Sequence, residues 1–590
     1  MLNKFLCLGN NHIVKGYKVS QYQTFVRSLA SFTARNILQE TSDEAGTLLT
    51  RFAKHIAFEL QKDTSVVPTV IRYADYFPIT DTRYLQRELN KISPHQLPAL
   101  IVFAFSYRAS ADPNKFASVL NELDATAIKL FSKMDVDTIL RTLYAFLYLM
   151  PNWITRMDFY ERAMGYLATN ANAENTTKEK FVQICFYLGL EKNHKTQNDK
   201  IFYNFLNDHL ETYLDKLSTL DLVTVASATF KTSTRVESET FKNRLKQELL
   251  KLSLEDSTND ALLVTLIKAM RFQRVRSKEI CEHLKKYCAP DIADRLQIRG
   301  CIHLFAYFAD NLYDDKSSIQ PLVKQCLHRI NASLKCDLQN ENIRGKDIAT
   351  FLWCCAQLNC SISKNDLKSI DMVLFNKIEQ NEYRHFRDQL VDSCLSLWML
   401  GYKSHDLIEE AVSLKLNARL NNKKDLRDLP KVESRLQVLL SAVAIEEPTW
   451  RFKNLKGTPE INIETPAPPY LLKDRFNFVD IANKIEEQPS VISSKLVCPI
   501  NGINIPSILV SYKEPANMKV FIELLPEEQI LQFSQSPMGV LSLKIRLLTS
   551  LGCKVVTLSP KEYKDESKSL DILALNIGDG DMPEVRSMKV

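Results

Sequence analysis

Apolar residues recur with helical spacing from residue 45 to residue 416. Within each segment they fall at positions i, i+3, i+4 and i+7, which places them on one face of a helix. The segments HQLPALIVFAFSY, DTILRTLYAFLYL and KDIATFLWCCAQL illustrate the pattern, each with a polar start and a small residue amid bulky ones. The pattern predicts a long succession of helices in this part of the chain.

The small residues recur at a regular interval. They stand at the centres of successive segments, at Ala104, Ala145, Cys185, Ala228, Ala269, Ala306, Ala356 and Ser396. The centres lie about 41 residues apart, and a second, more charged helix is expected after each of them. Such spacing is typical of an α-solenoid, in which a helix pair buries its apolar face only against its neighbours. A large helical bundle is the alternative, because its helices would have the same 3.6-residue period.

We therefore expect a mainly α fold, with a solenoid of about eight helix pairs over residues 45–416. The small residues would allow two helices to approach closely. Residues 417–474 read as a linker or collar, with a polar stretch, one further helix (VESRLQVLLSAVAI) and a proline-rich segment.

Beyond residue 474 the apolar period changes toward two. Residues 503–512 and 518–525 are predicted to be strands, VLSLKIRLLTSL a helix ended by Gly552, and residues 553–559 a third strand. The order strand, strand, helix, strand predicts a small α/β domain over residues 475–577, with a helix packed on a sheet. Residues 578–590 are polar and are expected to form a flexible tail.

Four short motifs within this domain resemble those of a known family. They are Ile522-Glu523, LKIRLL (543–548), LGCKVV (551–556) and PKEY (560–563). In this combination they resemble the RAP domain, an RNA-binding domain. Members of that family place the domain after helical repeats, as in the mitochondrial FAST-kinase-domain proteins and the octotricopeptide-like RNA-binding proteins. The resemblance implies a fold similar to that of PD-(D/E)xK nucleases.

The nuclease residues themselves are incomplete. Such enzymes hold Mg²⁺ between two acids on adjacent strands and need a lysine two residues after the second acid. Glu523 stands in the place of the second acid, but Leu525 occupies the lysine position and residues 503–512 contain no acid. Glu527 and Glu528 belong to a loop, which suits them poorly as replacements. Glu523 is therefore a degenerate nuclease-like position with a structural or RNA-orienting role, and we expect no catalytic residue, metal or cofactor.

Basic side chains near the end of the domain are the candidates for RNA contact. The proposed residues are Lys544, Arg546, Lys554, Lys561 and Tyr563. Lysine and arginine would neutralise phosphates, and the tyrosine would stack on an unpaired base. Lys544 and Arg546 diverge by about 200° on a helix, so only one of them is expected to face RNA. The alternative is that these are ordinary surface charges and a tyrosine at the edge of the core.

The first 39 residues contain no Asp or Glu, but they contain Lys4, Lys15, Lys18, Arg27 and Arg35. An acid-free, basic and Ser-containing start predicts a mitochondrial targeting peptide over residues 1–40, with a basic disordered arm as the alternative. No apolar run approaches the ~18 residues of a membrane span, so no membrane association is expected. The 13 cysteines are scattered without a CxxC pair and are expected to be reduced core residues.

The combined expectation is a non-catalytic RNA-binding protein of the mitochondrial matrix. It would hold single-stranded or fragmented messenger or ribosomal RNA, acting in processing, stabilisation or ribosome assembly. The alternative is a structural subunit of the mitochondrial ribosome that contacts mainly ribosomal proteins. The net charge of +6 is compatible with both. An endoribonuclease is a third possibility, which the incomplete acid set disfavours.

Overall fold

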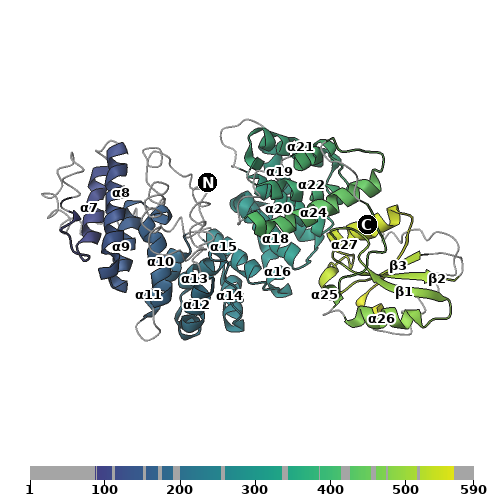
Figure 1. Ribbon diagram of the computed structural model, residues 1–590, viewed down its shortest axis with the longest axis horizontal. Helices are drawn as coiled ribbons and strands as arrows, with labels where there is room; N and C mark the ends of the chain where they lie inside the picture. The colour runs from purple at the N-terminus through teal and green to yellow at the C-terminus, as the bar shows by residue number, and fades with distance from the viewer. Residues whose placement is uncertain are drawn as a thin grey trace, which may run out of the picture. The chain divides into compact units, whose positions relative to one another are not determined.

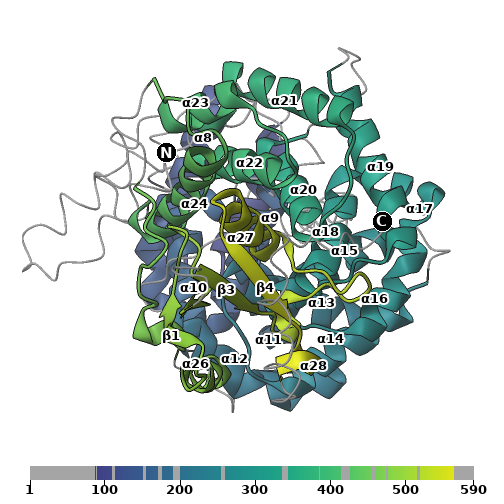
Figure 2. The same cartoon turned by 90° about the vertical axis from the view of Figure 1, so that its right-hand side faces the viewer.

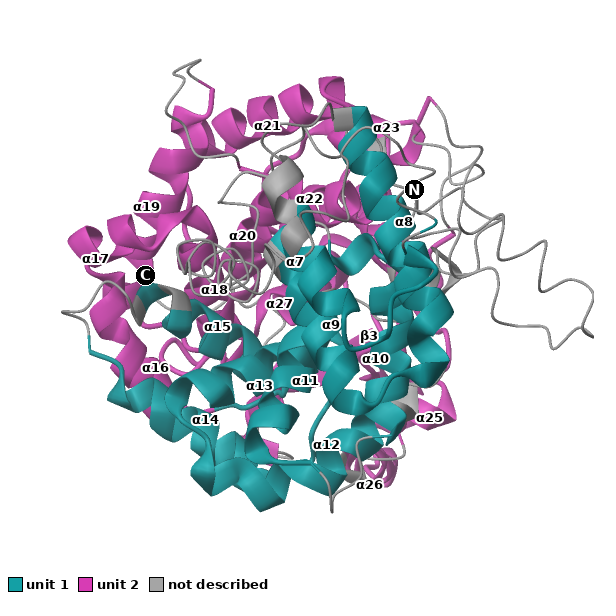
Figure 3. Cartoon of the chain, turned by 90° about the vertical axis from the view of Figure 1, so that its left-hand side faces the viewer, with its two compact units in different colours: residues 1–276 teal, residues 277–590 magenta. Residues whose placement is uncertain are grey.

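The chain folds into two compact units, residues 1–276 and residues 277–590, which are described separately (Figure 3). The computed structural model describes residues 87, 89–108, 113–150, 154–170, 176–190, 199–253, 259–334, 343–384, 386–413, 425–453, 460–472, 476–513 and 519–563. Over these residues the protein is mainly helical, with a small mixed sheet near the C-terminus (Figure 1). The predicted targeting peptide and flexible tail lie outside the described residues.

The described part of the first unit is built from helices and short 3₁₀ turns. The helices are α7 (Leu97–Arg108), α8 (Pro113–Leu130), α9 (Val136–Leu149), α10 (Asp158–Asn170), α11 (Lys178–Leu188), α12 (Asp199–Tyr213), α13 (Thr219–Lys231), α14 (Glu239–Lys251) and α15 (Asn259–Phe272). Helix α7 packs against α9, and α11, α13 and α15 pack in succession. The intervening helices α8, α10 and α12 pack against one another as a second row.

The second unit continues with helices and ends in the sheet. Its helices are α16 (Lys278–Leu284), α17 (Pro290–Arg295), α18 (Gln297–Asp310), α19 (Lys316–Ala332), α20 (Gly345–Gln357), α21 (Lys364–Glu379), α22 (Arg387–Met399), α23 (His405–Ser413), α24 (Asp425–Glu446), α25 (Pro469–Leu472), α26 (Phe476–Glu486), α27 (Gly539–Ser550) and α28 (Pro560–Tyr563). Helices α18, α20, α22 and α24 pack in succession, and α17, α19, α21 and α23 form the outer row (Figure 2).

The small residues at the centres of the repeated segments are buried throughout. Each of the eight is at most 2% exposed. They lie on α7, α9, α11, α13, α15, α18, α20 and α22, which are the helices that pack in succession within each unit. Because a small side chain lets neighbouring helix backbones approach, this burial agrees with the packing role expected from the sequence.

Side-chain caps define where many of these helices begin. Ser218 accepts a hydrogen bond from the backbone N–H of Asp221, and the Asp221 side chain accepts one in return from the backbone N–H of Ser218. Other helices of both units begin with a side chain that accepts a backbone N–H, without the reciprocal bond, at Asp135, Thr177, Ser238, Ser277, Asp315 and Ser363. These caps satisfy backbone N–H groups that have no partner inside the helix.

Five of the eight helices that carry the small residues share a way of ending. The second residue after the helix has a positive φ at Ser233 (59°), Arg274 (56°), Leu312 (55°), Asn359 (50°) and Gly401 (81°). The next backbone N–H then donates back into the helix, as from Thr234 to the Thr229 carbonyl (2.9 Å). This is the Schellman arrangement, for which glycine is the usual residue. Here the end of α22 has glycine, whereas α13, α15, α18 and α20 use larger residues in the left-handed conformation.

The sheet has the order β1-β2-β3-β4 and is mixed. Its strands are β1 (Val491–Val497), β2 (Ser507–Tyr512), β3 (Lys519–Leu524) and β4 (Lys554–Leu558). The first three are antiparallel neighbours, and β4 is parallel to β3. Apolar side chains of α26 and of all four strands form the core on one face of the sheet. Helix α27 contacts β4 and places Lys544 beside Glu523 of β3.

The structure confirms the predicted strand, strand, helix, strand order, with boundaries shifted by a few residues. The sequence reading missed α26 and β1, which precede these elements. It also placed α24 within a linker over residues 417–474. In the structure α24 packs against α22 and α27, so this part of the segment is integral to the second unit. The α/β module, here residues 476–563, belongs to that same unit.

Candidate nucleic-acid interface

Glu523 lies at the centre of the α/β module and is closed off from solvent. Lys544 donates to its Oε2 atom at 2.7 Å, and the side chains of this ion pair are 1% and 0% exposed. Ser507 of β2 donates to Oε1 at 2.6 Å, and Lys544 also donates to the Ile505 carbonyl at 2.9 Å. Each carboxylate oxygen therefore has a donor, which a buried charge requires.

This arrangement leaves no place for a metal ion at the nuclease-like position. The ammonium group of Lys544 occupies the space and supplies the positive charge that would otherwise attract a cation to Glu523. Among the residues that the structure describes, no three His, Cys, Asp or Glu side chains gather as a metal site would require. Of the two roles predicted for Glu523 from the sequence, structural or RNA-orienting, the buried ion pair favours the structural one.

The prediction that Lys544 contacts RNA is wrong, because its side chain is completely buried. The sequence reading assumed that Lys544 and Arg546 diverge and that one of them is solvated. They do diverge, but both are directed at protein partners. A lysine in LKIRLL cannot be assigned to the surface from helical spacing alone, since a buried carboxylate on a facing strand changes where it belongs.

Arg546 holds α27 against the preceding helices. Its Nε donates to Glu446 of α24 at 2.7 Å, while Nη1 and Nη2 donate to the carbonyls of Met399 and Trp398 at 3.0 and 2.9 Å. Trp398 in turn donates from its indole nitrogen to Glu446. All three guanidinium nitrogens thus have partners inside the unit, which makes Arg546 an internal link. Its side chain is 38% exposed, and its contact with RNA stays a prediction.

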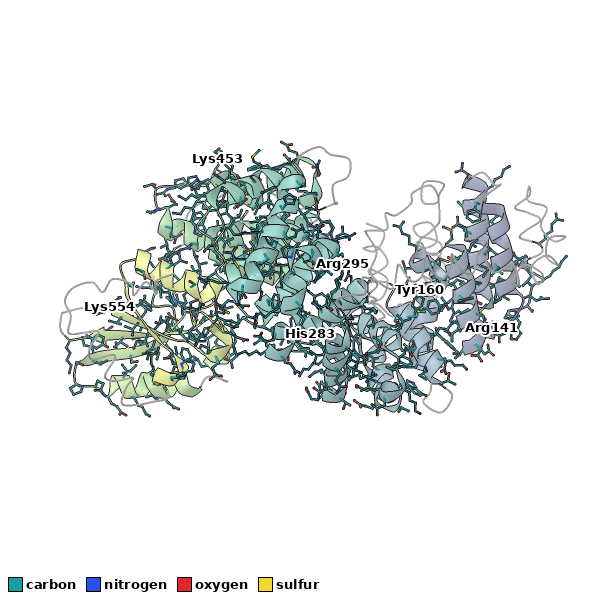
Figure 4. The ribbon with its side chains drawn as sticks, turned by 180° about the vertical axis from the view of Figure 1, so that it is seen from behind. Arg141, Tyr160, His283, Arg295, Lys453 and Lys554 are labelled. Carbon is teal, nitrogen blue, oxygen red and sulfur yellow. The ribbon has the colours of Figure 1, made fainter. Side chains whose placement is uncertain are left out.

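The remaining predicted residues lie at opposite ends of β4. Lys554 is its first residue and is partly exposed (Figure 4). Lys561 is exposed but follows the far end of the strand, on α28. Tyr563 packs against the core, where burial and then the carboxylates of Glu528 and Glu527 raise its pKa. The structure therefore does not bring these three residues together as one binding patch.

A loop of the module, residues 530–538, docks on the ends of two helices. The backbone N–H groups of Phe533 and Ser534 donate to Asp314, beyond the end of α18, at 2.7 and 3.0 Å. The Gln532 N–H donates to the carbonyl of Leu312 at 2.9 Å. At the end of α20, Asn359 donates to the carbonyl of Pro537 at 2.9 Å.

Helix α27 approaches α20 so closely that its first residue must be glycine. A Cβ at Gly539 would lie 2.1 Å from the backbone oxygen of Ala356. Ala356 is one of the small residues of the repeated segments. Its backbone therefore contacts α27, in addition to the contacts that α20 makes with α18 and α22. Together with Arg546 and the docking loop, this contact joins the module to α18, α20, α22 and α24 (Figure 2).

The described cysteines are free thiols, most of them buried, as expected from their apolar surroundings. Burial raises the pKa of the Cys185 thiol well above its ordinary range, so it is a poor nucleophile. No helix in the described ranges combines the length and apolar character needed to cross a membrane. No protein-family model matches the chain, and no curated protein matches it.

A set of exposed arginines escaped the sequence reading. Arg235, Arg274 and Arg276 lie in the turns that follow α13 and α15. The signal that could have found them is a stretch of residues 261–278 with Lys268, Arg271, Arg274, Arg276 and Lys278 but no acid. The three arginines lie in connecting turns, about which the helical period of the apolar residues carries no information.

Proposed function

We propose that this protein binds RNA in the mitochondrial matrix without cleaving it, acting on organellar transcripts or ribosomal RNA. The observation that carries the non-catalytic part is the buried Glu523–Lys544 ion pair, which removes the acid of the nuclease-like position from solvent and from metal ions. The RNA-binding part rests on the RAP-domain motifs and on the succession of paired helices that precedes them.

In this proposal the helices form an α-solenoid of about eight pairs, and the α/β module is a RAP domain with a PD-(D/E)xK-like fold. The contact pattern inside each unit supports the first point, since helices that carry the small residues pack against one another with a second row beside them. Such arrays offer a long surface to an extended partner. Processing, stabilisation and ribosome assembly are the roles that suit a binder of this kind.

The test is a sedimentation profile of a mitochondrial matrix extract, with crosslinked RNA sequenced from each fraction. Crosslinks to transcripts or precursor ends in light fractions would support a processing or stabilising factor. Crosslinks at constant places in ribosomal RNA, in fractions that contain ribosomal particles, would identify a ribosomal component. Absence of crosslinks from every fraction would contradict RNA binding.

Cleavage is tested separately with purified protein. Labelled RNA is incubated with Mg²⁺ or with Mn²⁺, and we expect no products above those of a Glu523→Gln variant. Metal-dependent products that this variant fails to form would overturn the non-catalytic assignment, because they would require Glu523 to leave its ion pair.

A further inference from the structure

The turns after α13 and α15 carry arginine at equivalent positions. Each helix ends in a left-handed residue, Ser233 or Arg274, and the residue two positions later is Arg235 or Arg276. All three arginine side chains, at positions 235, 274 and 276, are exposed. None of the three forms an ion pair with another residue that the structure describes.

The two turns are held together by a buried glutamine. Gln273 accepts the backbone N–H of Val236 at 2.9 Å and donates to Thr229 Oγ1 at 3.1 Å. It is only 5% exposed. The guanidinium group of Arg235 also lies over the ring of Phe272, 5.9 Å from its centroid. The arginines are therefore presented by a braced backbone rather than by a loose loop.

After α18 and α22 in the second unit, the residue two positions after the left-handed residue forms hydrogen bonds to other parts of the unit. After α18 the residue two positions beyond the left-handed Leu312 is Asp314, which accepts the backbone N–H groups of the docking loop. After α22 it is Lys403, which donates to Glu447 at 2.6 Å. The residue at this position is acidic after α18, where the docking loop supplies hydrogen-bond donors. It is basic after α22, where Glu447 supplies an acceptor.

We infer that Arg235, Arg274 and Arg276 form a contact surface for the phosphate groups of single-stranded RNA. This surface is called the arginine edge below. The inference rests on the proposed RNA-binding function and assigns it to a place on the first unit. Arginine offers a planar fork of donors that matches phosphate oxygens. Residues on successive helix ends suit a ligand with repeated acceptors. The exposed acids nearest to them in the sequence are Glu237, Glu239 and Glu279.

The experiment compares two variants of the full chain with the same change in net charge. The edge variant carries Arg235→Gln, Arg274→Gln and Arg276→Gln. The control variant carries Lys115→Gln, Lys133→Gln and Lys216→Gln, which are exposed positions elsewhere in the same unit. Affinity for fluorescein-labelled oligouridylate is measured by anisotropy over about 50 to 200 mM salt. Circular dichroism melts check that both variants remain folded.

We expect the edge variant to lose tenfold or more in affinity at about 100 mM salt, with its salt slope reduced by about 2, because each lost phosphate contact on a single strand removes about 0.7. The control variant should stay within about twofold of the wild type. An Arg→Lys triple variant should retain most of the salt slope, since lysine still neutralises phosphate.

The outcomes separate the two proposals. If the wild type binds no RNA, the proposed function fails and the arginine edge fails with it. If the wild type binds and the edge variant equals the control, the arginine edge is wrong while RNA binding stands. Loss of poly-glutamate binding together with unchanged RNA binding would show an edge for an acidic protein, and it would also overturn the inference.

Discussion

Two groups of basic side chains in this protein differ in whether they have acidic partners within the protein. Lys544 of α27 is buried and Arg546 is partly exposed, and both donate hydrogen bonds within the unit to Glu523, Glu446 and backbone carbonyls. Arg274 and Arg276, in the turn after α15, are exposed. The first group lies in the motif LKIRLL that resembles an RNA-binding family, and the second lies in no motif at all.

The difference between the groups is where the acids are. Glu523 is on β3, which faces α27. Glu446 is the last residue of α24, and α24 packs against α27. A basic side chain forms an ion pair within the protein when the fold places an acid from a distant part of the chain beside it. Among the described residues, no acid forms an ion pair with the arginines in the turns after α13 and α15, which is the basis for proposing an external partner there.

The largest effect is expected from breaking the buried pair. Lys544→Met should destabilise the second unit by about 3–5 kcal/mol, because it leaves Glu523 charged and unpaired in the core. The double variant Lys544→Met, Glu523→Gln should recover most of that loss. The measurement is the denaturant midpoint of the unfolding transition, and equal midpoints for the single and double variants would contradict the reasoning.

Arg546→Met tests the link between the module and the helices. We expect a loss of about 1.5–3 kcal/mol, the usual range for hydrogen bonds to a charged group. Hydrogen exchange should rise at the end of α22 and in α27, because the carbonyls of Trp398 and Met399 lose their donor. Unchanged exchange in both helices would show that the link is dispensable. RNA affinity should change far less than for the edge variant.

Gly539→Ala tests the close approach of α27 to α20. The added Cβ would lie 2.1 Å from the Ala356 oxygen, so α27 must shift, at a cost of about 1–3 kcal/mol. Gly165→Ala is the matched control, since its Cβ would meet nothing within 4 Å. In helix α10 that change should stabilise by about 0.5–1 kcal/mol. Thermal melts of the two variants should therefore shift in opposite directions.

Acid unfolding should reveal the cap of α19. Burial raises the pKa of Asp315, but hydrogen bonds from Ser318, Lys285 and Ser317 outweigh it and lower the pKa to about 2. A lowered folded-state pKa stabilises above the ordinary value of 3.8 and is lost as the pH falls toward 2. Asp315→Asn keeps a side chain that can cap the helix but removes the carboxylate charge, so it should cost about 1–2 kcal/mol at pH 7 and much less at pH 2. An equal cost at both pH values would exclude this cap as the source.

The smallest effect on stability is expected from replacing Arg274, an exposed arginine in the turn after α15. Arg274→Gly should stabilise the first unit by at most about 1 kcal/mol, because glycine adopts the left-handed conformation without strain. The same change should weaken RNA binding and lower its salt dependence. A gain in stability with full RNA affinity would show that the arginine at this turn has no binding role.

The sequence by itself predicted the elements whose signal is local. The helical period, the small residues such as Ala356, the glycine that ends α27 and three of the four strands follow from spacing and turn chemistry within a few residues. Strand β1 was missed because VISSKLV is interrupted by polar residues without a strict alternation, and its pairing with β2 decides its conformation.

Only the tertiary structure decided which basic side chains pair with acids inside the protein. Glu523 and Lys544 are 21 positions apart, and Glu446 and Arg546 are 100 apart, so no local pattern relates them. The folding of sheet, α24 and α27 together brings these acids and bases within hydrogen-bond distance. Whether a lysine binds RNA or neutralises a buried acid therefore depends on long-range packing, because desolvation makes an unpaired charge in the core too costly to keep.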